Sequence, residues 1–296
     1  MPVSLFVTGV DGYLGRHLLS RLDPARYDKV RALTRREPRA QAAPDGVAFI
    51  HGDLLERSAY STSLAECDTI LHMAAVTGKA RPQEYFRVNR GGTKALLDEA
   101  RRAGVRRFFF ISSIAARFQD QSRYYYAQSK RQAEELVARS GIPYAILRPT
   151  IIMGPGAPVI DSLAKLAGAP VVPIFGDGRA RVQPVSVGDL AACLLSMVEH
   201  GGFEREVIEI GGPEALSIEE LLLKIRRARY GKPARVLHLP VRPIAAVLGA
   251  LEKFLFPVLP VTAGQLASFT YDGTAQSSFP GPCAPRETIE EVLSCC

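Results

Sequence analysis

Up to about residue 150, short apolar runs alternate with longer segments whose apolar positions recur every three to four residues. The short runs are rich in β-branched and aromatic residues and predict strands, whereas the longer periodicity predicts amphipathic helices. We expect strands at residues 3–8, 30–34, 47–51, 69–73, 108–112 and 144–148, and helices notably at residues 13–22, 82–103 and 124–140. This alternation predicts an α/β fold in which a doubly wound parallel sheet carries helices on both faces.

The pattern changes after Pro149, because Gly and Pro become frequent over residues 154–184 and the regular alternation is lost. Helical periodicity returns at residues 188–199, 217–230 and 243–255, with a short strand at residues 207–210. We therefore expect one unit at residues 1–153, with return segments near residues 182–212. Residues 154–296 are expected to form mainly a second, smaller region.

The stretch "VTGVDGYLGRHLL" follows the first predicted strand and opens the first predicted helix, with Gly9, Gly12 and Gly15 spaced three apart. Small residues allow a tight turn and a close approach to a pyrophosphate, and the helix N-terminus offers unpaired N–H groups to the phosphates. This context predicts a dinucleotide-binding loop within residues 1–153. The alternative is a simple glycine-rich turn.

The end of the second predicted strand bears on the choice of cofactor. An acidic residue about 20 positions after the glycines would bind the ribose diol of NAD, whereas an arginine accommodates the 2′-phosphate of NADP. Here the strand ends in "RALTRR", with Arg35 and Arg36 and no acid before Glu37. NADP(H) is therefore favoured, with Arg35 as the main contact, while NAD(H) stays possible. Arginines that only contact solvent are the alternative.

The stretch "ISSIAARFQDQSRYYYAQSK" contains the candidate catalytic residues. Ser112 and Ser113 end a predicted buried strand, at the sheet edge where doubly wound folds bind ligands. Tyr126 and Lys130 are four residues apart and share one face of a helix, so the lysine charge is expected to lower the pKa of the phenol. Neither of the two preceding tyrosines has a lysine at that offset.

These motifs resemble the short-chain dehydrogenase/reductase superfamily, and especially its extended branch with "TGxxGxxG". The stretches "GDL", "HMAA", "VNRGGT", "LRPTIIMGPG", "QPVSVGDLA" and "EIGGPEALSIEELL" resemble the landmarks of that branch in the same order. The resemblance implies a Rossmann fold with a smaller C-terminal substrate-binding region. It also implies hydride transfer between a nicotinamide cofactor and a carbonyl or alcohol.

The resemblance also implies roles for individual residues. Tyr126 would be the general acid/base, Lys130 the ribose anchor, and Ser113 the residue that polarises the substrate oxygen, with Ser112 as an alternate. The alternative is a surface tyrosine and lysine on a helix that the serines cap. The carboxylate of Asp53 would take the adenine amino group. The residues expected to contact the cofactor are Gly9, Gly12, Tyr13, Leu14, Gly15, Arg35, Arg36, Asp53, Leu54, Ala74, Ala75, Lys130 and Pro149.

Three functions follow from these residues. The first is an NADP(H)-dependent oxidoreductase, and the second is a nucleotide-sugar epimerase or dehydratase that keeps its cofactor bound. Many sugar-modifying members carry "SSxxVYG" where this chain reads "SSIAARF", which disfavours the second. The later stretches "QPVSVGDLA" and "PVTAGQLASF" resemble relatives of the NADPH-binding accessory subunit of respiratory complex I. The third function is therefore a non-catalytic NADPH-binding protein supporting a membrane complex, although the tyrosine and lysine favour an enzyme.

Composition and charge restrict the partners. The net charge of +7 comes from scattered arginines without a basic block, which disfavours nucleic acid and fits anionic small molecules better. The five cysteines, Cys67, Cys193, Cys283, Cys295 and Cys296, are odd in number and lack metal-ligand spacing, so we expect no metal site. Their usage, together with a start that has no export signal, predicts a reduced, cytoplasmic location.

Three expectations concern surfaces. We expect no transmembrane span, but the helix at residues 243–255 is apolar enough to contact a membrane interface or, preferably, a partner or the core. The helices at residues 82–103 and 124–140 occupy positions that often form a homodimer in the superfamily. A small-molecule substrate should bind roughly at residues 153–182 and after Pro213.

Overall fold

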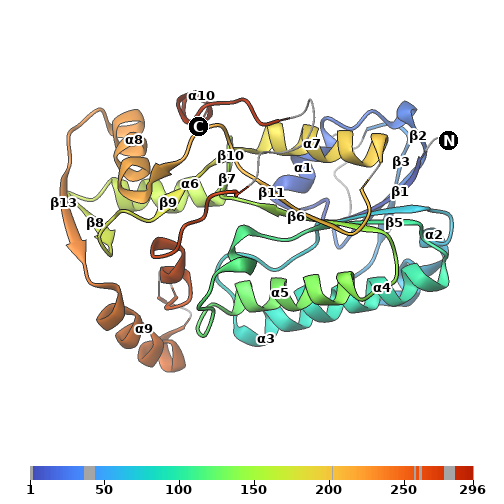
Figure 1. The fold of residues 1–296 in the computed structure, drawn as a ribbon, viewed down its shortest axis with the longest axis horizontal. Coiled ribbons are helices and arrows are strands. Elements are labelled where there is room, and N and C mark those ends of the chain that lie inside the picture. Colours follow the sequence, from blue (N-terminus) through green and yellow to red (C-terminus); the bar gives the residue numbers. More distant parts are fainter. Residues whose placement is uncertain are drawn as a thin grey trace.

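A parallel sheet of seven strands forms the larger part of the molecule (Figure 1). The structure is a computed structural model that describes residues 3–36, 44–201, 203–256, 258–259, 262–276 and 284–295. The predicted strands are all present, with ends that differ by up to a few residues, and the predicted α/β doubly wound fold is confirmed. In spatial order the strands are β11 (Glu206–Ile210), β6 (Tyr144–Pro149), β5 (Arg107–Ile111), β4 (Thr69–His72), β1 (Val3–Thr8), β2 (Tyr27–Thr34) and β3 (Val47–His51).

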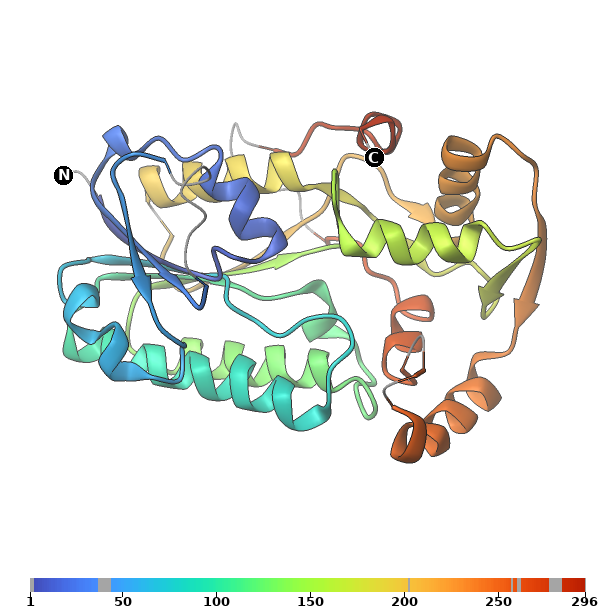
Figure 2. The same ribbon diagram turned by 180° about the vertical axis from the view of Figure 1, so that it is seen from behind.

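Helices cover both faces of this sheet (Figures 1 and 2). On one face lie α1 (Tyr13–Leu19) and α7 (Val187–His200); on the other lie α2 (Ser61–Leu64), α3 (Pro82–Tyr85), α4 (Thr93–Arg102) and α5 (Tyr125–Ala138). Because neighbouring strand residues point to opposite faces, Val7 enters the core under α1 and α7 while Phe6 enters the core beside α4. Both side chains are fully buried, which contributes about 1.5 to 3 kcal/mol each.

The strand order reverses at β1, with β2 and β3 on one side and β4, β5, β6 and β11 on the other. In doubly wound sheets a ligand binds beyond the carboxyl ends of the strands at such a reversal. The carboxyl ends face the smaller lobe of the molecule (Figure 1). The fold therefore predicts that the residues after β1, β2, β4 and β5 form a ligand site.

The helix predicted at residues 82–103 has the expected extent but not a uniform pitch. Between α3 and α4, the segment Phe86–Gly92 is a π-helix, in which the hydrogen bonds span one residue more than in an α-helix. Periodicity did not reveal this change. π-helical turns occur often at functional sites, and this one contains the buried Asn89.

The smaller lobe has its own core. Met153, Leu163, Val172 and Leu221 belong to one buried apolar cluster. Residues 154–184, where the alternation is lost, contain a helix and a strand, α6 and β8, which the sequence pattern did not predict; Pro158 lies in the first turn of α6, where a missing N–H is tolerated. The elements beyond β6 are β7 (Ile152–Met153), α6 (Pro158–Ala167), β8 (Val171–Phe175), β9 (Arg181–Val182), β10 (Val185–Ser186), β12 (Leu216–Ser217), α8 (Ile218–Tyr230), β13 (Arg235–Leu239), α9 (Val241–Leu255) and α10 (Ile289–Ser294).

Helix α9 lies beyond the N-terminal end of α5 and extends away from the rest of the smaller lobe (Figures 1 and 2). None of the helices in the described part of the chain has both the length and the apolar content needed to cross a bilayer. Three residues mentioned above, Glu37, Cys283 and Cys296, lie outside the described residues. The remaining thiols include Cys67 and Cys193, which are both buried.

Candidate active site

The glycine loop after β1 has room only for small residues. Gly9 has a φ of +82°, and a Cβ built on it would lie 2.5 Å from the backbone nitrogen of Ala74. A Cβ on Gly15 would lie 2.2 Å from the carbonyl oxygen of Gly9, so α1 packs directly on the turn. Because these neighbours are backbone atoms, they cannot move aside. The loop therefore forms a backbone cradle of the kind that a pyrophosphate needs.

A cavity of about 190 Å³ adjoins this cradle. It includes most of the predicted cofactor contacts: Gly9, Gly12, Arg35, Arg36, Asp53, Leu54, Ala74 and Ala75. Its other lining residues are Thr8, Asp11, Leu33, Gly52, Met73, Val76 and Val88. Glycines, arginines and a carboxylate thus line one cleft, and this set fits the phosphates and adenine of a dinucleotide. Their role as cofactor ligands stays a prediction.

Five residues expected to contact the cofactor are not part of this lining: Tyr13, Leu14, Gly15, Lys130 and Pro149. Tyr13 packs against the core of the smaller lobe, and Leu14 packs against the core under α1 and α7. Gly15 acts through packing, as its close approach to Gly9 requires. Lys130, in α5, bonds to the end of β5, and Pro149 is the last residue of β6.

Asp11 is a cleft residue that sequence reasoning missed. Its carboxylate accepts hydrogen bonds from the Thr34 hydroxyl at 2.8 and 2.9 Å and from the Arg35 backbone N–H at 3.1 Å. It thereby joins the glycine loop to the end of β2. The available signal was its position between two glycines of the loop, where a side chain must point away from the tight turn.

A buried hydrogen-bonded chain fixes the turn after β4. His72 is fully buried, with Nδ1 2.7 Å from the Thr8 hydroxyl and Nε2 2.9 Å from the Thr93 hydroxyl. Since Thr93 donates its own proton to the Asn89 carbonyl, Nε2 must donate to Thr93 and Nδ1 must accept from Thr8. Burial and the charge of Lys130 lower the pKa of His72 to about 3, so the ring stays neutral. Thr8 in turn accepts from Ala74, which lines the cleft.

Tyr126 and Ser113 are brought together at the carboxyl end of β5. Burial raises the pKa of Tyr126 to about 12, and the side chain of Ser113 acts in the opposite direction. Ser113 also caps the 3₁₀ helix Ile114–Arg117 by accepting from the Ala115 N–H at 3.2 Å. The pKa of the phenol is raised, contrary to the lowering expected from the lysine, because burial dominates.

Lys130 is buried beneath the same strand end, with an exposed fraction of 1%. Its Nζ donates to the Ile111 carbonyl at 2.6 Å and lies 4.2 Å from the centroid of the Phe110 ring. Burial lowers the pKa of Lys130 to about 7, and the nearby carboxylate of Glu134 acts in the opposite direction. The ammonium group is thus held by the end of β5 rather than by the phenol.

Two further polar residues differ in how they are used. The Asn89 side chain accepts from the N–H of Val76 and donates to its carbonyl. Asn89 also donates to the Ser129 hydroxyl, which donates to the Tyr126 carbonyl. The π-helix thus supports α5 beside the cleft. Ser112 is 4% exposed and its Oγ has no hydrogen-bond partner among the described residues. Of the two candidate serines, Ser113 is the one whose side chain affects the pKa of Tyr126.

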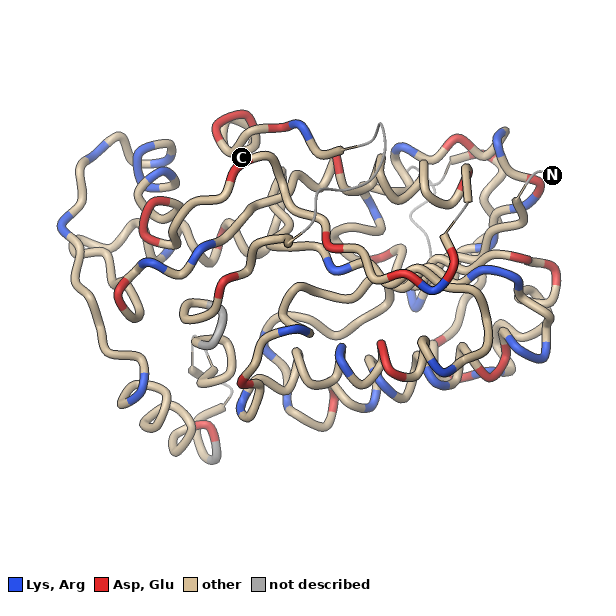
Figure 3. Tube along the Cα trace, viewed as in Figure 1, with Lys and Arg blue, Asp and Glu red and all other residues tan. Residues whose placement is uncertain are grey.

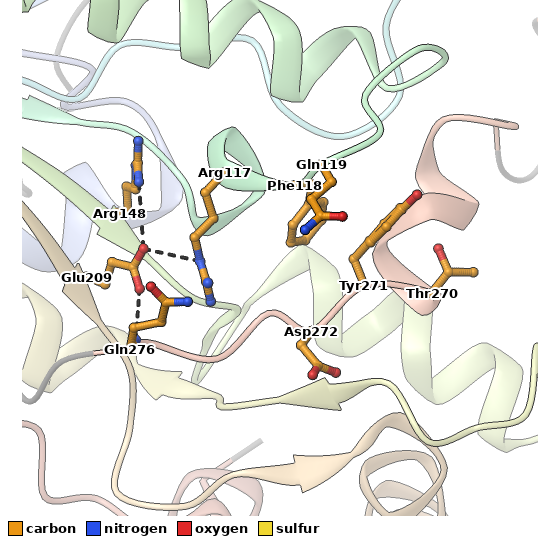
Figure 4. A pocket seen from close by; sticks show the side chains of 9 residues that line it. All are labelled: Arg117, Phe118, Gln119, Arg148, Glu209, Thr270, Tyr271, Asp272 and Gln276. Carbon is orange, nitrogen blue, oxygen red and sulfur yellow. Dashed lines mark hydrogen bonds and ion pairs between the residues drawn. The ribbon is translucent and has the colours of Figure 1, made fainter.

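A second cavity of about 660 Å³ lies beside these residues (Figure 4). On one side, the buried carboxylate of Glu209 is 3.2 Å from Arg117 and 3.7 Å from Arg148. On the other side, the rings of Phe118 and Tyr271 stack with centroids 5.4 Å apart. The guanidinium groups are therefore already paired, and the aromatic side is the apolar part of the cavity.

The aromatic side of this cavity continues to the candidate acid. Phe118 packs in one apolar cluster with Tyr124, Tyr126 and Tyr271. The Tyr126 ring lies 5.9 Å from the Tyr124 ring and 6.0 Å from the Tyr85 ring. We call Tyr85, Phe118, Tyr124, Tyr126 and Tyr271 the aromatic cluster. Its five members come from three separate segments, around residues 85, 118–126 and 271, which is why no local sequence pattern predicted it.

The parallel sheet, the glycine cradle and the residues at the carboxyl end of β5 define a nicotinamide-dependent enzyme of the short-chain dehydrogenase/reductase class. The family model for the NAD dependent epimerase/dehydratase family matches residues 5–211. The chain therefore belongs to that family. The predicted superfamily is confirmed.

Two relatives extend the similarity. A ceramide reductase of Caulobacter vibrioides is 37% identical over 193 residues, which cover 64% of this chain and 59% of that enzyme. A ketoreductase of Stigmatella aurantiaca, named for 4-hydroxy-2-methyl-3-oxo-4-farnesyl-3,4-dihydroquinoline-1-oxide, is 33% identical over 291 residues. That match covers 89% of this chain and 85% of the ketoreductase.

A solved structure supports the fold. The UDP-glucuronic acid 4-epimerase from Bacillus cereus in complex with NAD has a TM-score of 0.68 and 23% sequence identity to this chain. The similarity covers 80% of this chain and 87% of the epimerase. At this identity it bears on the fold alone.

Proposed function

We propose that this protein is a reductase that uses NADP(H) in preference to NAD(H) and reduces a ketone of an apolar, lipid-like molecule. The observation that carries the proposal is that the side chain of Ser113 acts on the Tyr126 phenol, with Lys130 one helical turn further along α5. When bound, the nicotinamide cofactor supplies the hydride. Ser113 holds the carbonyl oxygen, and Tyr126 gives it a proton as negative charge develops there.

The protonation state of Tyr126 favours reduction. Because burial raises the pKa of Tyr126 to about 12, the phenol carries its proton at neutral pH and is ready to act as an acid. Lys130 would hold the ribose hydroxyls and stabilise the phenolate that forms after proton transfer. Gly9 and Gly12 would hold the pyrophosphate, and Asp53 would hold the adenine.

The aromatic cluster and the relatives favour an apolar substrate. The Tyr126 ring lies among other aromatic rings. Members of this cluster form the apolar side of a cavity whose opposite side carries the already paired Glu209, Arg117 and Arg148. The two relatives described above are named as reductases of a ceramide and of a farnesyl-bearing ring. Both names describe a polar centre attached to a long apolar chain, which is the substrate class we propose here.

Titration with NADPH and NADH tests the cofactor preference. Arg35 and Arg36 line the cleft and suit a 2′-phosphate. NADPH should therefore bind more tightly than NADH by about 1 to 3 kcal/mol. Arg35→Ala should remove most of that difference, whereas Arg131→Ala, an exposed arginine outside the cleft lining, should leave it unchanged. Equal affinities in the unaltered protein would refute the preference.

A turnover assay separates the proposed reductase from its alternatives. The protein should oxidise NADPH in the presence of long-chain ketones and should release its cofactor during purification. An epimerase or dehydratase would retain the dinucleotide and convert nucleotide sugars without net oxidation. A non-catalytic binding protein would bind NADPH but turn over neither class. The cytoplasmic location, the homodimer and the absence of a nucleic-acid partner stay predictions.

A further inference from the structure

The described residues of the smaller lobe expose an unusually apolar helix face. The exposed fractions are 59% for Val247, 37% for Leu251, 84% for Phe254, 44% for Leu255 and 75% for Val258, just after α9. Val247, Leu251, Phe254 and Leu255 follow one another at intervals of at most four residues on one broad side of α9, and Val258 follows in the turn after it. We call these five residues the α9 face.

The opposite side of α9 is attached near the candidate acid. Arg123 donates to the Ala245 carbonyl at 3.2 Å, and the Glu252 carboxylate accepts from the Ala263 N–H. Gly264 packs so closely that a Cβ on it would lie 2.3 Å from the Arg123 carbonyl. Arg123 is three residues before Tyr126, so α9 is fastened at the entrance to α5 and its apolar face points away from that attachment.

A second attachment comes from the segment between β4 and α3. The Nζ of Lys79 donates to the Leu259 carbonyl and lies 5.0 Å from the centroid of the Phe256 ring. The neighbouring Gly78 carbonyl accepts from the hydroxyl of Tyr85, a member of the aromatic cluster. Helix α9 is thus attached to two segments, one at Arg123 and one at Gly78 and Lys79, and each adjoins the aromatic cluster.

We propose that the α9 face docks on an anionic lipid surface and brings the aromatic cluster close to a membrane-held substrate. The inference rests on the proposed function for the nature of that substrate. An interfacial helix buries its apolar side about 5 to 10 Å into the boundary between head groups and acyl chains. The trace of α9 in Figure 3 carries few charges, so few ions would be buried with its apolar side.

Charge and size both favour lipid over a second copy of the chain. The net charge of +7 favours an anionic surface, and Arg123 and Arg242 are exposed close to the first turns of α9. The helical part of the α9 face, from Val247 to Leu255, is about 12 Å long. Such a patch offers roughly a few hundred Å², whereas a stable dimer buries about 800 Å² on each partner.

Vesicle flotation of the full chain tests the proposal. The unaltered protein should float with vesicles of phosphatidylcholine that contain roughly a quarter of phosphatidylglycerol, and less with phosphatidylcholine alone. Val247→Gln/Phe254→Gln should reduce the vesicle-bound fraction at least about tenfold, because two exposed apolar side chains are lost while helix propensity is kept. Leu237→Gln is the matched control, since Leu237 is 54% exposed on β13 but lies outside the α9 face.

The outcomes distinguish this inference from the proposed function. NADPH titration of each variant reports whether the fold and the cofactor cleft are intact, so loss of flotation with unchanged NADPH binding supports docking. The proposal is overturned if the unaltered protein stays unbound, if the double variant still floats, or if Leu237→Gln has the same effect. A dimer that the double variant dissociates, without vesicle binding, would assign the α9 face to a second copy. Absence of NADPH binding in the unaltered protein would refute the proposed function while leaving the flotation result valid.

Discussion

The nucleotide-binding part and the smaller lobe each bury a basic side chain against backbone carbonyl groups. Lys130, at the end of β5, is 1% exposed and donates to one carbonyl, that of Ile111. Arg226, in α8, is 9% exposed and donates to three carbonyls in the segments that end α6 and α8. The arginine closes the ends of two helices, whereas the lysine, besides its contact with the Phe110 ring, makes no second hydrogen bond among the described residues.

The same contrast holds for hydroxyl groups. In the smaller lobe, Ser217 and Glu220 form a complete capping box at the start of α8. Beside β5, the buried Ser112 hydroxyl has no partner within the described part of the chain. Polar groups in the lobe thus complete its helix ends, whereas polar groups at the end of β5 keep hydrogen-bonding capacity that the described residues leave unused.

The largest expected effect comes from the phenol. Tyr126→Phe should lower turnover about 10²- to 10⁴-fold with little change in NADPH affinity, because it removes the proton donor and keeps the ring packing. The measurement is the steady-state rate together with an NADPH titration. Tyr125→Phe is the control, since Tyr125 is 37% exposed and packs against Phe86.

The same experiment can contradict the assignment of Tyr126 as the proton donor. If Tyr126→Phe keeps full activity, the acid must come from elsewhere, and Tyr271 of the aromatic cluster is the candidate from the C-terminal part of the chain. Tyr271→Phe should otherwise change turnover by less than about tenfold, because its ring stacking with Phe118 survives the loss of the hydroxyl.

A pair of glycine substitutions gives the next largest effect. Gly15→Ala should weaken NADPH binding by about 2 kcal/mol or more, because the new Cβ would lie 2.2 Å from a backbone oxygen of the phosphate loop. Gly168→Ala in the smaller lobe would place its Cβ 2.6 Å from the Tyr230 hydroxyl, the end of a partly exposed side chain that can rotate. It should cost less than about 1 kcal/mol of stability. Similar losses in both variants, measured by titration and urea unfolding, would contradict this difference.

The two parts also differ in how far the sequence predicts them. The strands and the glycine loop follow from local patterns, because a parallel sheet requires apolar runs and a phosphate loop requires glycines. The role of Ser113 is implied only by the resemblance to the superfamily. The aromatic cluster depends on contacts between distant segments. The raised pKa of Tyr126 likewise comes from burial, which spacing alone does not report.

Asp11 and α6 are two other features that the sequence patterns did not predict. The contacts of Asp11 with Thr34 and Arg35 cross from the loop to β2, so no periodicity encodes them. Frequent Gly and Pro around α6 hid its periodicity, but Pro158 occupies the first turn and the buried side of α6 is stabilised by packing against α8.

The buried basic residues provide a third prediction. Lys130→Met should raise the free energy of unfolding at pH 6 by about 1 to 3 kcal/mol while abolishing the support for Tyr126, because a poorly partnered buried amine is replaced by an apolar chain. Arg226→Met should lower the free energy of unfolding by a similar amount, since three carbonyl groups lose their donor. Urea unfolding measures both, and a loss of stability in Lys130→Met would contradict the contrast.

The effect of Lys130→Met on the free energy of unfolding depends on pH, and its direction follows from the pKa of Lys130. Burial lowers the pKa of Lys130 to about 7 in the folded protein, whereas a lysine in the unfolded chain titrates near 10.4. Between these values the unfolded state binds more protons, so stability rises with pH. The advantage of Lys130→Met should therefore be largest and constant below pH 7 and should disappear towards pH 10. An advantage that grows with pH would show that the lysine is charged throughout.

The smallest expected effects come from two serines, one in each part. Ser112→Ala should leave turnover unchanged and change stability by less than about 0.5 kcal/mol, because the buried hydroxyl that it removes lacks a partner within the described residues. Ser217→Ala should cost about 1 kcal/mol, because it breaks the capping box of α8. Urea unfolding and the turnover assay distinguish them. A large fall in turnover for Ser112→Ala would transfer the polarising role from Ser113 to Ser112, and the unpartnered hydroxyl would then be the one that awaits the substrate oxygen.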